Sequence, residues 1–219
     1  MVQFHPSYGY EDFIEGLRPA IDTEGRVNFQ PVAGEVLRFV KDIGESPESH
    51  FLLIDEMNRA NLSRVFGELM YLFEYRDEEI DLRLTKAFRL PPNLRFIGTM
   101  NTADRSIRSI DIALRRRFDV FELPPNGQVL ERFYAKGENT NNVSSLLHEF
   151  EKLNEELVDR RDRHHTIGHA FFMTQEMTTA HLNAVWERKI GPLIEEYFYD
   201  QPDVAATFAA SEFWVELAS

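Results

Sequence analysis

The first 124 positions of the chain alternate between short apolar runs and segments in which apolar residues have helical spacing. Compact apolar runs predict strands at Val2–His5, His50–Ile54, Leu94–Thr99 and Phe118–Leu123. Apolar residues that recur every three or four positions predict helices at Tyr10–Leu17, Val32–Ile43, Leu62–Tyr75 and Ser109–Arg116. A polar hairpin is predicted at Ile80–Leu84 and Ala87–Leu90. Because strands alternate with helices, we predict an α/β fold with a mostly parallel sheet.

After Leu123-Pro124-Pro125 the apolar pattern has helical periods only. Helices are predicted at Gln128–Ala135, Val143–Arg160, Thr179–Lys189 and Pro192–Phe198, with one more short helix in the tail from Pro202. We therefore predict two domains, an α/β domain over residues 1–124 and an all-helical domain over residues 125–219.

Composition narrows the class of protein. The chain has 219 residues, of which 43% are hydrophobic and 18 are Phe, and this is enough for a packed core. Because there is no Cys, disulfide bonds and thiolate chemistry are excluded. The net charge of −13 argues against a chain that binds DNA by bulk electrostatics. We find neither a long apolar run nor a signal-peptide pattern, so we expect a cytoplasmic protein that does not enter a membrane.

Two acids follow the apolar run Phe51–Ile54. Asp55 and Glu56 are expected at the carboxyl end of a buried strand, where open parallel sheets bind their ligands. In a nucleotide hydrolase, an Asp at this position holds Mg²⁺, usually through water, and a Glu polarises the attacking water. The alternative is a strand that ends in solvated acids at a turn. The polar continuation Met57–Ser63 favours a functional site.

A second polar group follows the predicted strand Leu94–Thr99. Asn101 is expected at the end of a neighbouring strand, where an amide can hold the attacking water or a phosphate oxygen. The alternative is a turn, because Asn, Thr, Asp and Ser all favour turns, and Asp104 or Ser106 could simply cap the next helix. The string Asn101–Ser106 as a whole favours the site.

Two clusters of basic residues follow. Arg115, Arg116 and Arg117 cannot all serve one salt bridge, so at least one is available to a phosphate in its own chain or in a neighbouring subunit. For any single one of them, the alternative is a solvated Arg at a helix C-terminus. The segment Arg160–His169 holds three Arg and three His without the spacing of metal ligands. We expect it to form a basic loop that faces phosphates.

Three strings of residues resemble one family. FLLIDEMNRANLSRVFGELM, FIGTMNTADRS and DIALRRRFDVFELPP are similar to the McrB-like branch of AAA+ proteins, the GTP-hydrolysing motor subunits of McrBC-type modified-cytosine restriction systems. The opening VQFHPSYGYEDFIEGLRP and the later IGHAFFM and WERKIGPLIEEYF are similar as well. The resemblance covers nearly the whole chain, and it implies an AAA+ sheet domain followed by a helical lid.

The resemblance also implies roles for single residues. The resemblance implies catalytic roles for Glu56, Asn101, Arg116 and Arg117. It implies contacts with the nucleotide for Asn58, Asp104 and His169. Asp55 matches the Walker B acid that holds Mg²⁺. In these roles Glu56 activates water and Asn101 is the sensor 1 amide. The two Arg act on the nucleotide of the neighbouring subunit.

One motif of the family is missing. A P-loop ends in Gly-Lys-Ser/Thr, so that backbone amides cradle the phosphates, but none of the five Lys of this chain follows a Gly. We expect the chain to begin just after this motif. The resemblance places the P-loop strand between Leu94–Thr99 and Phe118–Leu123. Without it, we expect Phe118–Leu123 to detach as coil, to pair with Leu94–Thr99, or to leave a gap that a partner chain fills.

We interpret the chain as the C-terminal part of an McrB-like hydrolase that uses Mg²⁺ and GTP, with ATP as the alternative nucleotide. The resemblance implies a homo-oligomeric ring, a hexamer, that drives an McrC-like nuclease, with DNA contacts in domains that this sequence lacks. Two alternatives remain open. One is an ATP-driven AAA+ remodeller of the MoxR or dynein-like kind, and the other is a non-catalytic assembly module. As it stands, the chain alone is expected to be inactive.

Overall fold

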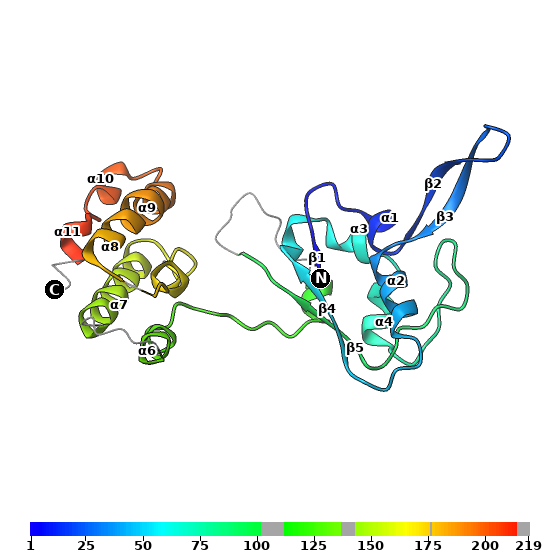
Figure 1. Cartoon of the computed structure of the whole chain (residues 1–219), viewed down its shortest axis with the longest axis horizontal. Coiled ribbons are helices and arrows are strands. Elements are labelled where there is room, and N and C mark those ends of the chain that lie inside the picture. The colour runs from blue at the N-terminus through cyan, green and yellow to red at the C-terminus, as the bar shows by residue number, and fades with distance from the viewer. Residues whose placement is uncertain (102–111, 137–142, 176, 214–219) are drawn as a thin grey trace. The chain divides into compact units, whose positions relative to one another are not determined.

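The computed structural model describes residues 1–101, 112–136, 143–175 and 177–213, and it divides the chain into two compact units, Met1–Phe121 and Glu122–Ser219 (Figure 1). In the N-terminal unit the elements are β1 (Val2–Gln3), α1 (Tyr10–Phe13), β2 (Glu15–Ile21), β3 (Val27–Ala33), α2 (Glu35–Ile43), β4 (His50–Asp55), η1 (Met57–Arg59), α3 (Leu62–Phe66), α4 (Leu69–Glu74), β5 (Leu94–Gly98) and α5 (Ile112–Arg115). In the C-terminal unit they are α6 (Gly127–Ala135), α7 (Val143–Arg160), η2 (His169–Phe172), α8 (Thr179–Val185), η3 (Trp186–Ile190), α9 (Gly191–Tyr197), α10 (Pro202–Ala205) and α11 (Ala210–Phe213). The predicted α/β fold followed by a helical domain is confirmed.

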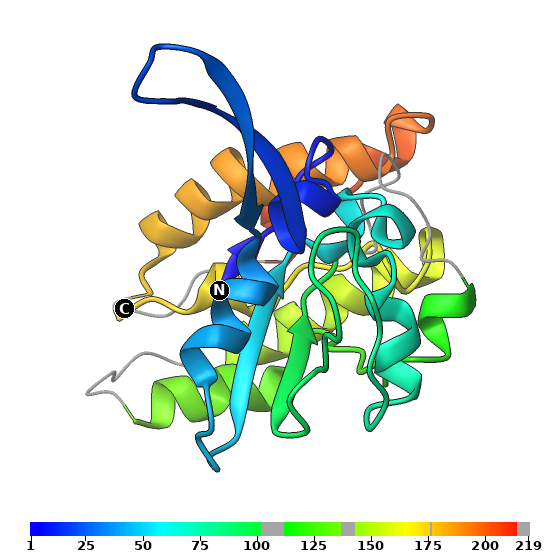
Figure 2. The same cartoon turned by 90° about the vertical axis from the view of Figure 1, so that its right-hand side faces the viewer.

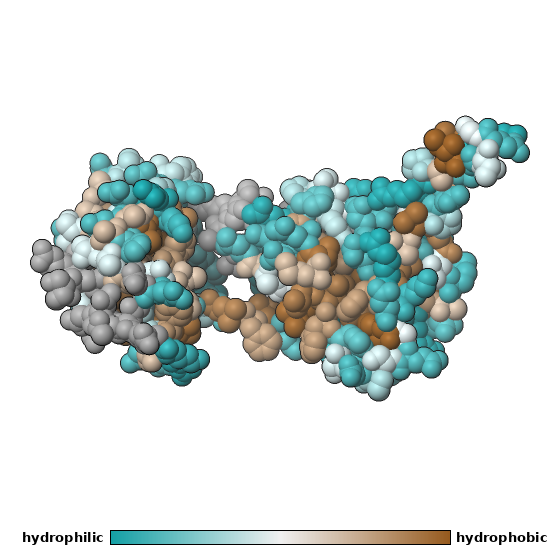
Figure 3. Space-filling model, in the orientation of Figure 1, coloured by the Kyte–Doolittle hydropathy of each residue, from teal (hydrophilic) through white to brown (hydrophobic). Residues whose placement is uncertain are grey.

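The central sheet is parallel and has the strand order β1-β4-β5. Leu52 and Ile54 of β4 face the hydrophobic core and are buried, whereas Phe51 and Leu53 on the other face are about half exposed. Hydrophobic surface is visible on this unit in Figure 3. Parallel sheets normally have both faces covered. In this sheet, the face that carries Phe51 and Leu53 lacks a cover among the described residues.

Aromatic rings form the core beneath the covered face of the sheet. The ring of Phe13, in α1, lies 5.4 Å from the rings of Phe4 and Phe66 in edge-to-face geometry. Phe73 of α4 makes a similar contact with Phe96 of β5, at 5.0 Å. These contacts fix the helices to the strands whose ends carry the candidate site.

The strand predicted at Phe118–Leu123 does not form. These residues lie in coil, and Val120, Phe121 and Leu123 are largely exposed. β5 is an edge strand, and the described residues contain no strand beside its outer edge. Phe118–Leu123 does not pair with this edge, so the first of the three expected outcomes, detachment as coil, is the one observed.

A β-hairpin, visible in Figure 2, replaces parts of two predicted helices. The helix predicted at Tyr10–Leu17 ends at Phe13, and the helix predicted at Val32–Ile43 begins at Glu35. Between them, apolar and polar residues largely alternate with a period of two, which is the spacing of strands. The sequence prediction assigned the apolar residues at both ends of this stretch to a helical period, and this was wrong.

The hairpin β2–β3 has one apolar face. Three cross-strand pairs lie on it, and their members are Leu17 and Pro31, Pro19 and Phe29, and Ile21 and Val27. All six residues are exposed, because the hairpin projects from its unit (Figures 1 and 3). The two Pro each remove one backbone N–H donor from a strand, and this limits pairing with further strands.

Two further predictions in the N-terminal unit need correction. The helix predicted at Leu62–Tyr75 is divided into α3 and α4 at Gly67, whose φ of 44° is in the region that favours glycine. The hairpin predicted at Ile80–Leu90 is reduced to one antiparallel bridge between Ile80 and Phe88. Of the helix predicted at Ser109–Arg116, Ile112–Arg115 is helical, and residues 109–111 lie outside the described residues.

The C-terminal unit is a set of helices around its own core. Phe150 of α7, Phe172 of η2, Ile194 of α9 and Phe213 of α11 are all buried in one cluster. The helix predicted at Thr179–Lys189 continues from α8 into η3, a π-helical turn. None of the helices in the described part of the chain is long and apolar enough to span a membrane.

Candidate functional site

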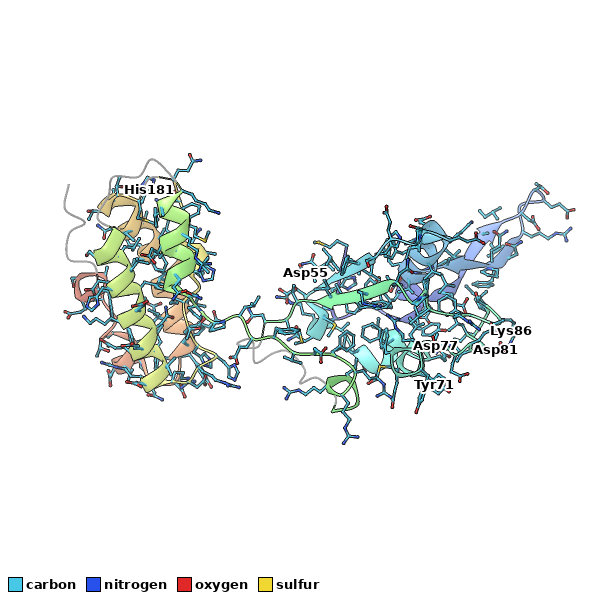
Figure 4. All side chains as sticks on the ribbon, turned by 90° about the horizontal axis from the view of Figure 1, so that it is seen from below. Asp55, Tyr71, Asp77, Asp81, Lys86 and His181 are labelled. Carbon is cyan, nitrogen blue, oxygen red and sulfur yellow. The ribbon has the colours of Figure 1, made fainter. Side chains whose placement is uncertain are left out.

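The carboxylate of Asp55, the last residue of β4, is held between the two neighbouring strands. Its Oδ1 accepts a hydrogen bond of 2.5 Å from the hydroxyl of Thr99, which follows β5. Its Oδ2 accepts a hydrogen bond of 3.3 Å from Nε2 of Gln3 in β1. Figure 4 shows Asp55 at the opposite end of the N-terminal unit from Asp81 and Lys86. The parallel register therefore brings side chains from the ends of both neighbouring strands to this carboxylate.

Glu56 has an unusual backbone conformation. Its φ of 52° and ψ of 43° place it in the left-handed region, which is uncommon for a non-glycine residue and occurs often at functional sites. Its N–H donates to Oγ1 of Thr99 at 3.3 Å. Its carboxylate forms an ion pair with Nε of Arg59 at 3.1 Å. The turn after β4 thus directs this acid away from the course of the strand.

Asn58 joins the turn after β4 to the segment after β5. Its side chain is buried, and its Nδ2 donates to the backbone carbonyl of Asn101 at 3.0 Å. Its Oδ1 is also buried and has no hydrogen-bond partner among the described residues. A buried acceptor without a partner costs free energy, and such atoms are normally paired. We therefore expect this oxygen to accept a hydrogen bond from a donor such as a water molecule.

Backbone contacts fix the same two strand ends. The N–H of Thr99 donates to the carbonyl of Ile54, and the N–H of Met57 donates to the carbonyl of Thr99, both at 2.9 Å. A Cβ atom on Gly98 would lie 2.6 Å from Sδ of Met57, so glycine permits this close approach. The structure therefore brings Asp55, Glu56, Asn58 and Asn101 to one edge of the sheet.

The arginines after α5 differ in their surroundings. Nη2 of Arg117 forms an ion pair with Glu74 at 2.7 Å, and its side chain is 22% exposed. Arg116 is exposed. Arg117 is therefore engaged within its own unit, whereas Arg116 faces solvent. Asp104 lies outside the described residues.

His169 lies in η2 of the C-terminal unit. Its Nδ1 accepts a hydrogen bond of 3.3 Å from the N–H of Asn126. Because Nδ1 accepts, the neutral ring carries its proton on Nε2, where it can donate to another group.

The basic loop 160–169 is mostly paired within the C-terminal unit. Arg161 binds Asp200 at 3.0 Å and is nearly buried, and Arg160 binds Glu156 at 3.2 Å. Desolvation raises the pKa of Asp162, but the hydrogen bonds from the His165 ring and the His164 amide outweigh it, so the pKa lies below the usual 3.8. These pairs weigh against the expectation that the whole loop faces phosphates.

Two family models match the chain. The model described as an AAA domain of the dynein-related subfamily matches residues 1–118, and the model of the McrB alpha-helical lid domain matches residues 145–206. The chain belongs to the AAA+ family and is McrB-like. The order of its two units, a sheet unit followed by a helical unit, agrees with the order of the two matches.

Relatives of this McrB-like chain include restriction proteins. The EcoKMcrB subunit of the type IV methyl-directed restriction enzyme of Escherichia coli strain K12 is 39% identical over 222 residues, which cover 92% of this chain and 47% of the relative. The YdiS component of the type II restriction enzyme BsuMI of Bacillus subtilis strain 168 is 28% identical over 137 residues, covering 53% of this chain and 38% of the relative. The chain thus spans less than half the length of each.

A solved structure is also similar to this McrB-like chain. It is a protein from Cytophaga hutchinsonii that is described as an ATPase candidate, with 18% identity and a TM-score of 0.36, and the match covers 72% of this chain and 48% of that one. At this level of similarity it adds nothing to the account of the site.

The acid of this McrB-like site whose lone pairs can take a metal ion or its water is Asp55. Within the described ranges, no group of three or more His, Cys, Asp or Glu side chains could hold a metal ion. Each oxygen of Asp55 accepts one hydrogen bond, and a carboxylate has about four lone-pair positions, so positions are left for a metal or its water. Mg²⁺ is commonly held by one or two carboxylates together with waters and substrate phosphates.

Two contact residues of the site were missed in the sequence. The apolar pattern predicts a strand that ends at Thr99 and a short strand that contains Gln3, but it gives neither residue a role, and both bind Asp55. The hydroxyl two positions before Asn101 was the available signal for Thr99. Gln3 gave no signal, because its contact depends on the pairing of β1 with β4.

Proposed function

We propose that this chain is the part of an AAA+ motor that activates water and holds Mg²⁺ during hydrolysis of GTP. The observation that carries the proposal is the pair of contacts between the two strand ends, from Thr99 to Asp55 and from Asn58 to Asn101. They bring two carboxylates and an amide to the edge at which parallel sheets bind ligands. An arrangement of this kind suits phosphoryl transfer, which depends mainly on positioning and electrostatics.

Each residue of the proposed site has a distinct task. Mg²⁺ bound there would neutralise charge on the β- and γ-phosphate oxygens. Asp55 would hold the ion through water, since both of its oxygens already accept a hydrogen bond from the protein. Glu56 would accept a proton from the attacking water, while Arg59 pairs with Oε2 of its carboxylate. Asn101 would hold that water, while Asn58 fixes the backbone of Asn101.

Arg116 is the better candidate for an arginine finger that acts on the nucleotide of a neighbouring subunit. It is exposed, whereas Arg117 is paired with Glu74 in its own unit. An Arg supplied across an interface requires a homo-oligomer, and we propose a ring of identical subunits. In phosphoryl transfer such a residue is worth roughly 10³–10⁵ in rate.

The proposed partner is an McrC-like nuclease, and the proposed substrate of the complex is DNA. The similarity to a subunit of a methyl-directed restriction enzyme supports this assignment. The net charge of −13 favours DNA contacts made outside this chain, because phosphate binding depends on local positive charge.

Turnover of GTP and ATP tests the proposal in a form of the protein that also carries a Gly-Lys-Ser/Thr loop. We expect Mg²⁺-dependent hydrolysis, faster with GTP, and a loss of at least about tenfold in Asp55→Asn, because the metal is no longer held. Asp77→Asn is the matched control, since it changes an exposed acid elsewhere in the same unit and should hydrolyse at the wild-type rate. Equal rates for all three proteins would refute the assignment.

The 219-residue chain alone should show almost no turnover. A phosphate cradle supplies most of the binding of a triphosphate, and no Lys of this chain follows a Gly. Robust hydrolysis by the chain alone would mean that the phosphates are bound in another way.

A further inference from the structure

Thr99 contacts both acids of the candidate site at once. A threonine hydroxyl has one hydrogen to donate and lone pairs with which to accept. Its hydrogen goes to Oδ1 of Asp55 at 2.5 Å, and its oxygen accepts the N–H of Glu56 at 3.3 Å. A single side-chain atom therefore links the side chain of one acid to the backbone of the next.

The backbone of Thr99 is itself fixed on both sides of these acids. Its N–H binds the carbonyl of Ile54, directly before Asp55, and its carbonyl accepts the N–H of Met57, directly after Glu56. The backbone of Thr99 is thus held at the turn, and only the χ1 rotation of its side chain sets where the hydroxyl lies. A left-handed non-glycine residue such as Glu56 persists where its surroundings over-determine its conformation, and these bonds provide that determination.

We propose that Thr99 is a positioning residue that sets the geometry of both acids for metal binding and for activation of water. The inference rests on the proposed function, and it adds a residue to which neither the sequence motifs nor the family resemblance gave a role. The hydroxyl orients the Asp55 carboxylate, so that its remaining lone pairs point to the metal position. It also stabilises the backbone turn from which the Glu56 side chain leaves.

Three variants separate this role from a general contribution to stability. Thr99→Val has nearly the same shape and removes the hydroxyl, whereas Thr99→Ser retains it. Thr85→Val is the matched control, because Thr85 also donates a hydroxyl hydrogen to a carboxylate, Oε2 of Glu15, at 2.6 Å in the same unit. If such bonds serve only the fold, the two Val variants will behave alike.

The first measurement uses the 219-residue chain itself. Hydrogen exchange followed by NMR reports whether the Glu56 amide is bonded. We expect this amide to exchange faster in Thr99→Val than in the wild type, and at the wild-type rate in Thr99→Ser and Thr85→Val. An unchanged rate in Thr99→Val would overturn the inference, because the hydroxyl would then not hold the turn.

The second measurement uses the form that carries a P-loop, with a non-hydrolysable GTP analogue and Mn²⁺ as the probe metal. Electron paramagnetic resonance measures the fraction of Mn²⁺ that is bound. We expect the affinity for Mn²⁺ to fall about tenfold to a hundredfold in Thr99→Val, as is typical when a residue that hydrogen-bonds a metal ligand is lost. In turnover assays, the same variant should need more Mg²⁺ and show a lower kcat with little change in the KM for GTP. Thr99→Ser should restore both properties.

Wild-type Mn²⁺ affinity in Thr99→Val, or a failure of Thr99→Ser to restore it, would contradict the inference. Failure of the proposed function would look different, because the wild type itself would then neither hydrolyse GTP nor bind Mn²⁺ with the analogue. Even in that case, exchange of the Glu56 amide decides whether the Thr99 hydroxyl holds the turn.

Discussion

Replacing Glu15 should destabilise the N-terminal unit more than its position in the sequence suggests. Glu15 begins the projecting hairpin, yet it is only 3% exposed. Its Oε1 accepts the N–H groups of Leu84 at 2.6 Å and Thr85 at 3.2 Å, and its Oε2 accepts the Thr85 hydroxyl. One carboxylate therefore satisfies three donors of a loop that lies about seventy positions away.

The magnitude follows from these three bonds. A hydrogen bond to a charged group contributes about 1.5–3 kcal/mol, and a donor left unpaired costs about 1–3 kcal/mol. Leu84 and Thr85 are partly exposed, so water can replace some of what is lost. We therefore expect Glu15→Ala to lower the free energy of unfolding by about 3 kcal/mol, out of a typical total of about 5–15 kcal/mol.

Urea unfolding followed by far-UV circular dichroism measures this loss. Glu15→Gln keeps an acceptor of the same shape and should lose about 1 kcal/mol. Asp81→Ala removes an exposed acid from the same loop, where it binds Lys86 at 3.0 Å, and should have a smaller effect than Glu15→Ala. The reasoning is refuted if Glu15→Ala loses less than Asp81→Ala, or if the Gln and Ala variants are equally unstable.

Three further predictions address other parts of the chain. Gly34→Ala should lower the free energy of unfolding by about 1–3 kcal/mol, because its Cβ would lie 2.5–2.7 Å from backbone atoms. A Cβ on Gly168 would meet nothing within 4 Å, so Gly168→Ala should leave the free energy of unfolding nearly unchanged. Since the pKa of Asp162 is lowered by its folded-state partners, its contribution to stability is complete above its unfolded pKa of about 3.8 and is lost as the pH falls through the lowered value. The stability difference between wild type and Asp162→Ala should therefore narrow as the pH falls below about 3.8, and a constant difference would contradict the pairing. Arg117→Ala should destabilise the N-terminal unit, whereas Arg116→Ala should not. Mixing Arg116→Ala subunits with Glu56→Gln subunits of a P-loop-bearing form should restore some turnover, and no recovery at any ratio would exclude a role for Arg116 across the interface.

The sequence predicted the parts of the site that depend on local pattern. His50–Ile54 and Leu94–Thr99 are short apolar runs that end in polar residues, and such runs become neighbouring strands when the sheet is parallel. The placement of Asp55 and Asn101 at one edge follows from this pattern alone. The division into a sheet unit and a helical unit was also visible, because the apolar period changes near Leu123.

The contacts that orient these residues were not predictable, because they join distant parts of the chain. Thr99 and Asp55 are 44 positions apart, and Gln3 and Asp55 are 52 apart, so both contacts depend on strand register. The ion pair of Arg117 depends on a helix that ends 43 positions earlier, at Glu74. Local pattern carries no information about such pairs.

Predictions that depended on neighbours also failed in two places. Phe118–Leu123 has the composition of a strand, but a strand needs a partner for its backbone, and this segment pairs with no strand of the described residues. The residues of β2 and β3 pair with each other, and beyond the buried Glu15 and Gly16 most of them are exposed, so their alternating pattern reflects an apolar face that is exposed on the projecting hairpin. A search for buried faces overlooks such an element.

Substitution of the proposed water-activating acid tests the central claim most directly. In a P-loop-bearing form, Glu56→Gln should bind GTP with wild-type affinity, measured by equilibrium titration, because Glu56 acts on water and not on the phosphates. Its single-turnover hydrolysis should fall by roughly 10²–10⁴, the usual contribution of a general base. Hydrolysis at the wild-type rate, or a loss of nucleotide binding that accounts for the whole decrease, would contradict the assignment of this edge of the sheet as the hydrolytic site.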